Sequence, residues 1–380
     1  MTTSSSSSTS KLNISCYESL DNAELAERIR RVKAEMGPRL LILGHHYQRD
    51  EVIELADLRG DSYGLSEQAA NNKDCEAIVF CGVHFMAETA DMLANRPERL
   101  AERDGRRVPV VLPDLEAGCS LADMAETNQV ERCWAELAEV IDIDDVTPIT
   151  YVNSTAGVKA FCGRRGGIVC TSANARAALD WAFRQRGRVL FFPDQHLGRN
   201  TARAMGIPLE QMPLWNPKQP ALGGIPTEAV RRAKVILWQG FCCVHQRFTP
   251  HDVAHFRAKY PDIKIIVHPE CMMEVADMAD AVGSTSFIIR AIEQSPPGTR
   301  WAVGTEQNLV HRLRREYPDK EIHLLSDKPS ICKTMSMIDL PRLCWSVETL
   351  AAGAPANVIE VEPETARWAL EALKRMLEVR

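Results

Sequence analysis

Continuous apolar runs alternate with helical patterns along this chain, and the alternation predicts its fold class. Apolar runs that do not alternate with polar residues, at 39–43, 189–192 and 263–267, are typical of parallel strands that are buried on both faces. Amphipathic patterns at helical spacing separate them, at 19–35, 83–93, 130–140, 173–183, 228–233, 250–259 and 364–379. The chain is therefore predicted to be an α/β protein with right-handed crossovers between parallel strands.

The predicted strands fall into three sets that repeat the same order of features. Each set has a strand ending in polar residues, a turn with a hydroxyl residue, two further buried strands and a cysteine. The strand ends lie at 45–47, 151–153 and 268–270, the turns at 61–62, 171–172 and 283–285, and the cysteines are Cys119, Cys242 and Cys332. This repeat predicts three similar α/β/α modules with short parallel sheets, related by a pseudo-threefold axis, and one metal site at the centre.

Module boundaries follow from the same pattern. We expect a disordered tail at 1–18, modules at 19–145, 146–260 and 261–340, and a C-terminal segment at 341–380 that packs on the first module. The tail has five serines at positions 4 to 8, no positively charged start and no apolar core, so it is not expected to be a secretory signal.

Composition narrows the function classes. Of 380 residues, 45% are hydrophobic and 25% charged, and the net charge of −6 gives no basic surface for nucleic acid. No apolar run approaches the roughly 20 residues that span a bilayer, so we expect no membrane contact and a cytoplasmic location. The twelve cysteines include no Cys-x-x-Cys pair, and in a long chain without a signal peptide they do not indicate a disulfide framework.

Polar side chains stand at the carboxyl ends of the first strand in each set, where ligands bind in parallel α/β sheets. These candidates are His45, Tyr47, Tyr151, Asn153, His268 and Glu270. His45 and Tyr47 face the same side of a strand because they are two positions apart. A buried Glu270 is expected to have a raised pKa and to exchange protons near neutral pH, although a loop salt bridge is the alternative.

Ser62, Ser172, Ser284 and Thr285 lie in the three turns, several of which are followed by helical patterns. A hydroxyl beside free amides at a helix start binds carboxylate or phosphate, whereas helix capping is the ordinary alternative for any one of them. Their equivalent positions in three modules favour an anionic small molecule held between the modules.

The three repeated cysteines leave two metal chemistries open. Three thiolates on a [4Fe-4S] cluster would leave one iron free to act as a Lewis acid on a substrate oxygen. Cys242 and His245, with Cys271, would instead form a zinc site of an aldolase or hydrolase. A non-catalytic iron–sulfur sensor is a third reading, which does not require Tyr47, His268 or Glu270.

Several ordered motifs resemble those of the quinolinate synthase family from about residue 41 to 337. They are Gly44-His45-His46-Tyr47-Gln48, Gly60-Asp61-Ser62, the stretch 81–90, Thr150-Tyr151-Val152-Asn153, 171–175, 239–245, His268-Pro269-Glu270-Cys271, 283–286 and Gly304-Thr305-Glu306. The resemblance implies three α/β modules around one [4Fe-4S] cluster held by Cys119, Cys242 and Cys332.

It also implies the condensation of iminoaspartate with dihydroxyacetone phosphate to quinolinate, with loss of phosphate and two waters. The implied ligand site comprises His45, Ser62, Tyr151, Asn153, Ser172, His268, Glu270 and Thr285, with Ser284 as a neighbour. Tyr47 and Glu270 would transfer protons, assisted by His268, and an aspartate oxidase is a possible transient partner that supplies the imine.

Overall fold

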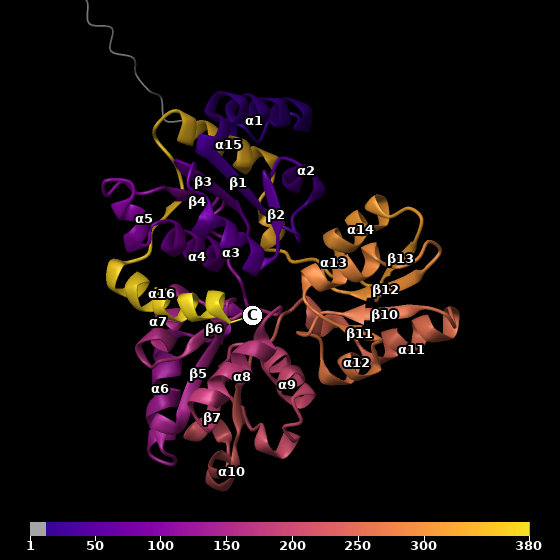
Figure 1. Ribbon diagram of the computed structural model, residues 1–380. Coiled ribbons are helices and arrows are strands. Elements are labelled where there is room, and N and C mark those ends of the chain that lie inside the picture. Colours follow the sequence, from indigo (N-terminus) through magenta and orange to yellow (C-terminus); the bar gives the residue numbers. More distant parts are fainter. Residues whose placement is uncertain (1–12, 380) are drawn as a thin grey trace, which may run out of the picture.

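The computed structural model describes residues 13–379 and consists of three α/β modules arranged around a common centre (Figure 1). The first sheet has the order β2-β1-β3-β4-β14, the second β6-β5-β7-β9-β8 and the third β11-β10-β12-β13. All strand pairs are parallel except that of β4 with β14. The predicted α/β fold with three similar modules is confirmed.

The strands of the first sheet are β1 (Leu40–His45), β2 (Leu58–Gly60), β3 (Ala77–Cys81), β4 (Val110–Val111) and β14 (Val358–Ile359). Those of the second are β5 (Val146–Tyr151), β6 (Ile168–Cys170), β7 (Arg188–Phe192), β8 (Leu214–Trp215) and β9 (Val235–Trp238). Those of the third are β10 (Lys264–Val267), β11 (Ala281–Val282), β12 (Arg300–Gly304) and β13 (Glu321–Leu324).

The helices around the first sheet are α1 (Asn22–Met36), α2 (Asp50–Ile53), α3 (Ser62–Asn71), α4 (His84–Ala94) and α5 (Pro97–Ala101). The second set is α6 (Thr127–Ala138), α7 (Ala156–Arg164), α8 (Ala175–Gln185), α9 (Gln195–Ala204) and α10 (Thr227–Arg232). The third is α11 (Pro250–Lys259), α12 (Met273–Met278), α13 (Thr285–Glu293) and α14 (Gln307–Glu316), followed by α15 (Leu340–Ala351) and α16 (Pro363–Glu378).

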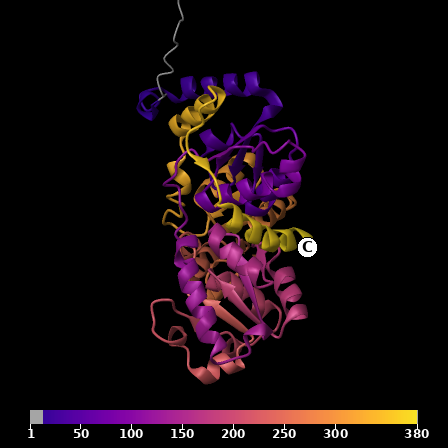
Figure 2. The ribbon, with the colours of Figure 1, turned by 90° about the vertical axis from the view of Figure 1, so that its left-hand side faces the viewer.

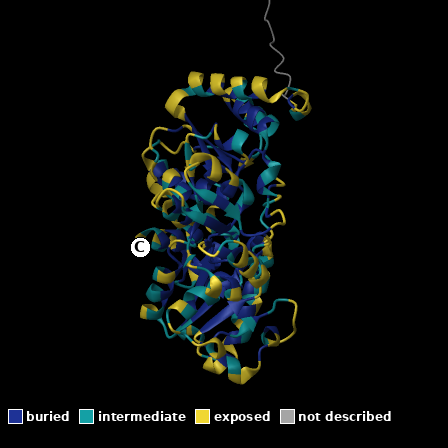
Figure 3. Cartoon of the chain, turned by 90° about the vertical axis from the view of Figure 1, so that its right-hand side faces the viewer, coloured by how far each residue is buried: buried dark blue, intermediate teal, exposed yellow. Residues whose placement is uncertain are grey.

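The central strands are buried on both faces, as their unbroken apolar sequences predict (Figure 3). In the third sheet, Ile265 and Val267 of β10 belong to one apolar cluster, whereas Ile266 between them belongs to another. Successive side chains of a strand point to opposite faces, so each face of this sheet has its own core. None of the helices in residues 13–379 is long and apolar enough to cross a membrane.

The same short structure follows each of the three repeated cysteines. Turns of 3₁₀ helix (Ala122–Met124, His245–Arg247 and Met335–Met337) begin three residues after Cys119, Cys242 and Cys332, and α6, α11 and α15 begin eight residues after them. In each loop the amide four residues beyond the cysteine donates to the cysteine carbonyl, at 3.1, 3.0 and 3.1 Å respectively. The three cysteines are therefore equivalent in backbone geometry as well as in order.

Helix packing corrects the expected module boundaries. α6 packs against α7 of the second module, and α11 packs against α12 of the third, so both helices belong to the module that follows them. The boundaries predicted after 145 and 260 are too late because a helical pattern does not reveal which sheet the helix covers. α15, in contrast, packs on α1 of the first module.

Two predictions about the chain ends need correction. α16 packs mainly on α7 and β6 of the second module and makes fewer contacts with α4 of the first, so it spans their boundary (Figure 2). The predicted tail is wrong for residues 13–18, since Ile14–Cys16 forms a 3₁₀ turn and the buried Tyr17 donates a hydrogen bond to Glu348 at 2.7 Å. Residues 1–12 lie outside the described part of the chain.

Candidate active site

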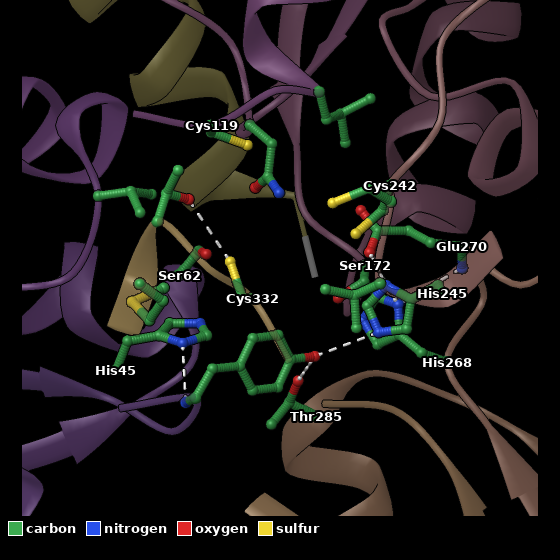
Figure 4. A pocket seen from close by; sticks show the side chains of 18 of the residues that line it. His45, Ser62, Cys119, Ser172, Cys242, His245, His268, Glu270, Thr285 and Cys332 are labelled. Carbon is green, nitrogen blue, oxygen red and sulfur yellow. Dashed lines mark hydrogen bonds and ion pairs between the residues drawn. The ribbon is translucent and has the colours of Figure 1, made fainter. Parts of the chain in front are cut away.

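A cavity of about 370 Å³ lies where the three modules meet (Figure 4). Its volume is typical of a site for a small molecule. The predicted residues that line it are His45, Tyr47, Ser62, Cys119, Tyr151, Asn153, Ser172, Cys242, His268, Glu270, Thr285 and Cys332. The equivalent strand ends of the three sheets therefore point into one shared space, as the repeat predicts.

In each module, one hydroxyl group that lines the cavity lies at the start of a helix. Ser62 and Thr285 are the first residues of α3 and α13, and Ser172 lies in the turn just before α8. Ser284 is the exception among the predicted residues, because it does not line the cavity. Its hydroxyl caps α13 by accepting a hydrogen bond from the amide of Phe287 at 3.3 Å.

Tyr47 crosses from the first module to the third. Its hydroxyl lies 3.0 Å from Thr285 Oγ1, 2.9 Å from Thr305 Oγ1 and 3.4 Å from His245 Nε2. Burial raises the pKa of Tyr47 well above its ordinary value, so the phenol is neutral at physiological pH. A neutral phenol held by three partners can donate or accept a proton without changing its position.

Glu270 is buried between two histidine rings. Its Oε2 lies 2.6 Å from His245 Nδ1 and 3.2 Å from His268 Nδ1, and the two rings stack with their centroids 4.3 Å apart. Burial alone would raise the pKa of Glu270, but His245 and His268 hold it well below its ordinary value. The predicted raised pKa is therefore wrong, and Glu270 is a carboxylate.

His245 connects Tyr47 with Glu270. Burial and the neighbouring His268 lower the pKa of His245, so its ring is neutral at physiological pH. With the proton on Nδ1, which faces Glu270, His245 Nε2 is free to accept from the Tyr47 hydroxyl. From the sequence, His245 belongs to the motif at 239–245, but it is predicted as a site residue only in the zinc alternative. Its position three residues after Cys242 is the signal that could have linked it to the same cavity.

His45 and His268 occupy equivalent strand ends and have the same local hydrogen bond. The Nδ1 atom of His45 accepts from the amide of Tyr47 at 3.1 Å, and that of His268 accepts from the amide of Glu270 at 3.4 Å. For His45, the proton of the neutral ring is then on Nε2. Burial lowers the pKa of His45 to about 3, so His45 is a neutral donor at this cavity.

The three cysteine thiols fit a thiolate-bound metal group. Cys119, Cys242 and Cys332 are free cysteines on three different loops, and they line the same cavity (Figure 4). Burial raises the pKa of each thiol, whereas the backbone amides of Ala122, His245 and Met335 act in the opposite direction. Amides directed at sulfur favour the thiolate, which a bound metal would stabilise further.

The ligand set of the zinc alternative is not assembled. Cys271 is buried in the core of the third module, and its thiol lies 3.6 Å from the Gly304 carbonyl oxygen. Candidate ligand atoms of Cys242, His245 and Glu270 do lie within 4.8 Å of one another. However, Glu270 Oε2 in this group already contacts two imidazoles.

Comparison with known proteins decides the family. The family model described as quinolinate synthetase A protein matches residues 27–378. The chain belongs to the quinolinate synthetase A family. It is 59% identical over 364 residues to the quinolinate synthase of Rhodopirellula baltica, covering 96% of this chain and 93% of that protein.

Two more quinolinate synthases show a similar degree of likeness. Identity is 52% over 379 residues with that of Nocardioides sp. (97% of this chain, 93% of the relative) and 50% over 362 residues with that of Bacillus mycoides (95% of each). Members of the quinolinate synthetase A family are iron–sulfur enzymes of NAD biosynthesis. Membership therefore favours the iron–sulfur reading over the zinc aldolase or hydrolase.

Proposed function

We propose that the central cavity condenses iminoaspartate with dihydroxyacetone phosphate to form quinolinate, phosphate and two waters. The observation that carries this proposal is the meeting of three free thiols with the Tyr47–His245–Glu270 series in one cavity of about 370 Å³. Carbon–carbon bond formation and dehydration need both proton transfer and an electrophile at a leaving oxygen. The cavity has residues suited to both.

Binding of the anionic substrates would use the three helix starts. Ser62, Ser172 and Thr285 place hydroxyls beside helix N-terminal amides on three sides of the cavity, where carboxylate and phosphate oxygens bind favourably. His45 would add a neutral N–H donor, which orients an oxygen without releasing a proton to it. Tyr151 and Asn153 line the second module's side of the cavity.

Proton transfer would pass along Tyr47, His245 and Glu270. The phenol gives its proton to a substrate atom or takes one from it, and His245 Nε2 exchanges that proton with the phenol. The Glu270 carboxylate stabilises the imidazolium that forms, because it lies 2.6 Å from Nδ1 of the ring. The ring of His268 stacks on the ring of His245, and both rings contact Glu270 Oε2. His268 would therefore hold the orientation of the His245 ring.

Cys119, Cys242 and Cys332 would hold one [4Fe-4S] cluster. With three protein ligands, such a cluster would keep one iron without a protein ligand, and it would supply Lewis acidity for a leaving hydroxyl or carbonyl oxygen. The protein itself would hold the three sulfur atoms and the proton-transfer residues around the same cavity.

The imine substrate is short-lived in water, and we propose that it arrives through transient contact with an aspartate oxidase. Chemical crosslinking of the two purified proteins during turnover should capture a complex. The proposal would be refuted if no crosslink forms and if quinolinate forms equally fast with the oxidase and with a diffusible source of the imine.

The proposed reaction is tested by anaerobic purification, iron and sulfide analysis, and chromatographic detection of quinolinate from the two substrates. We expect about four irons per chain, quinolinate formation, and an electron paramagnetic resonance signal of the reduced protein that changes when quinolinate is added. Zinc without sulfide in a protein kept free of oxygen, together with no quinolinate, would refute the proposal.

A further inference from the structure

One helix in each module follows the third strand, and the three copies share a register. The first amides of α4, α9 and α14, at His84, Gln195 and Gln307, donate to the carbonyls two residues before the three cysteines, at 2.8, 2.9 and 2.8 Å. Positions along these helices can therefore be compared directly. The sixth residue of each is Thr89, Asn200 and Arg312.

Asn200 reaches from the second module into the third. Its side-chain amide donates to the carbonyls of Pro269 and Cys271, both at 2.9 Å. These two residues flank Glu270 in the chain. The backbone on both sides of Glu270 is thus held by one side chain of another module.

Arg312 makes the equivalent connection from the third module into the first. Its guanidinium donates to the carbonyl of His46 and, at 3.5 Å, to that of Gln48. These residues flank Tyr47, and Asn308 of the same helix donates to the Tyr47 carbonyl at 3.2 Å. Arg312 is only 4% exposed, so these bonds form in a buried interface.

The third equivalent position makes no such contact. Thr89 of α4 donates to the Phe85 carbonyl within its own helix. The carbonyls that flank Asn153 are bonded inside the second module instead, that of Val152 to the amide of Ser154 and that of Ser154 to Lys159. The sixth residue of the helix therefore holds the backbone of a neighbouring module at Tyr47 and at Glu270. Near Asn153, the contact from α4 is made instead by Glu88, whose Oε2 accepts from the amide of Ala156 at 3.0 Å.

We infer that Asn200 and Arg312 are positioning residues that clamp Glu270 and Tyr47 from the neighbouring module. This inference rests on the proposed proton transfer through those two residues. The clamps make the relative position of Tyr47 and Glu270 depend on how three modules dock, because each end of the series is fixed by a different module. His245, between them, lies on the second module's cysteine loop.

The helices themselves provide matched control variants. Three residues beyond Asn200, Arg203 pairs with Asp277 of the third module at 2.7 Å. Three residues beyond Arg312, Arg315 pairs with Asp50 of the first module at 2.8 Å. Arg203→Gln and Arg315→Gln therefore remove a contact between the same modules and keep the hydrogen bonds of Asn200 and Arg312 to the backbone carbonyls. After Arg315→Gln, Asp50 still has Arg312 as a partner, at 3.4 Å.

The first test is kinetic and uses the cluster-loaded protein. Asn200→Ala and Arg312→Lys should lower kcat about tenfold to a hundredfold, with KM and iron content close to wild type and both control variants unchanged. In a double-mutant cycle, Asn200→Ala should add little to the loss caused by Glu270→Gln, and Arg312→Lys little to that of Tyr47→Phe. The inference would be overturned if kcat is unchanged in the single variants, or if the losses in kcat of the two substitutions multiply in the double variants. It would also be overturned if iron content falls together with kcat.

The second test does not depend on activity. Hydrogen exchange of peptides covering 268–272 should become at least about tenfold faster in Asn200→Ala only, and that of 45–49 in Arg312→Lys only. Equal exchange in the variants and the Arg203→Gln and Arg315→Gln controls would overturn the clamps, even for a chain that makes quinolinate. Conversely, a wild-type chain that forms no quinolinate would refute the proposed function, while the exchange data would still decide whether the clamps exist.

Discussion

At the scale of single residues, the environment of Glu270 shows what the sequence could and could not predict. The strand-end pattern correctly brings Glu270 and His268 into the cavity. It gives the wrong protonation state, because the position of His245 on another module cannot be read from the spacing around Glu270. The contact of Glu270 with His268 follows from their closeness in sequence. The contact with His245 depends on tertiary structure, because His245 comes from another module.

Replacing Glu270 by glutamine tests the role of its charge. Glu270→Gln keeps the size of the side chain but removes the negative charge that stabilises a protonated His245. We expect kcat to fall about a hundredfold or more while iron and sulfide content stay at the wild-type level. Steady-state kinetics beside metal analysis measures both, and wild-type kcat would exclude Glu270 from proton transfer.

Burial of neutral His45 predicts a loss of stability in acid. Its folded pKa of about 3 lies below the roughly 6.5 of an unfolded histidine, so the unfolded chain binds more protons between these values. Stability should therefore fall as pH decreases below about 6.5, by up to about 1.4 kcal/mol per pH unit from this residue. Anaerobic urea unfolding from pH 7.5 to 5 measures the slope.

In the same experiment, His45→Asn should make the decrease shallower, because asparagine does not titrate. Part of the slope should remain, because burial also lowers the pKa of His46, His196 and His245. His251→Asn, at an exposed position of α11, should keep the wild-type slope. Parallel curves for wild type and His45→Asn would contradict the assignment of this acid sensitivity to His45.

At the scale of elements, glycine sets how closely two helices approach. A Cβ atom at Gly163 of α7 would lie 1.8 Å from the Trp368 carbonyl oxygen of α16. The apolar face of α16 predicts that this helix packs against another element, but it does not identify that element. The partner is determined by the absence of a side chain at Gly163, which lets the backbone of α16 approach α7. This explains why the helix was predicted correctly and its partner was not.

Gly163→Ala should separate α7 from α16. Alanine normally stabilises a helix interior relative to glycine by about 1 kcal/mol, but here we expect destabilisation of about 3 kcal/mol from overpacking. Thermal unfolding of the variant measures the change in Tm. Gly64→Ala in α3 is the control, because the nearest atom to its new Cβ is 3.5 Å away, and it should not lower Tm.

At the scale of the whole molecule, the repeat is the most informative feature of the sequence. The order of strands, hydroxyl turns and cysteines predicts three modules and the identity of the three thiols at their centre. The modules that α6 and α11 join, and the clamps by Asn200 and Arg312, were not predicted. They depend on contacts between modules, which periodicity within one module does not contain.

A shared metal group would make the three cysteine loops depend on one another. Each loop belongs to a different module, and the thiols face one cavity, so a bound cluster would be a crosslink between loops that are far apart in sequence. Cys332→Ser should therefore lose iron and also loosen the loops that it does not belong to. Hydrogen exchange at 119–124 and 242–247 should approach that of metal-free wild type.

Cys344→Ser, at a buried thiol of α15 outside the cavity, is the matched control and should keep both iron and loop protection. Two results would count against a shared ligand set: full iron content in Cys332→Ser, or faster exchange confined to 332–337. The second result would mean that each loop is stabilised by its own 3₁₀ turn and backbone bonds alone. Cooperative loosening of all three loops requires a bond that joins them, and the three thiols are placed to form it.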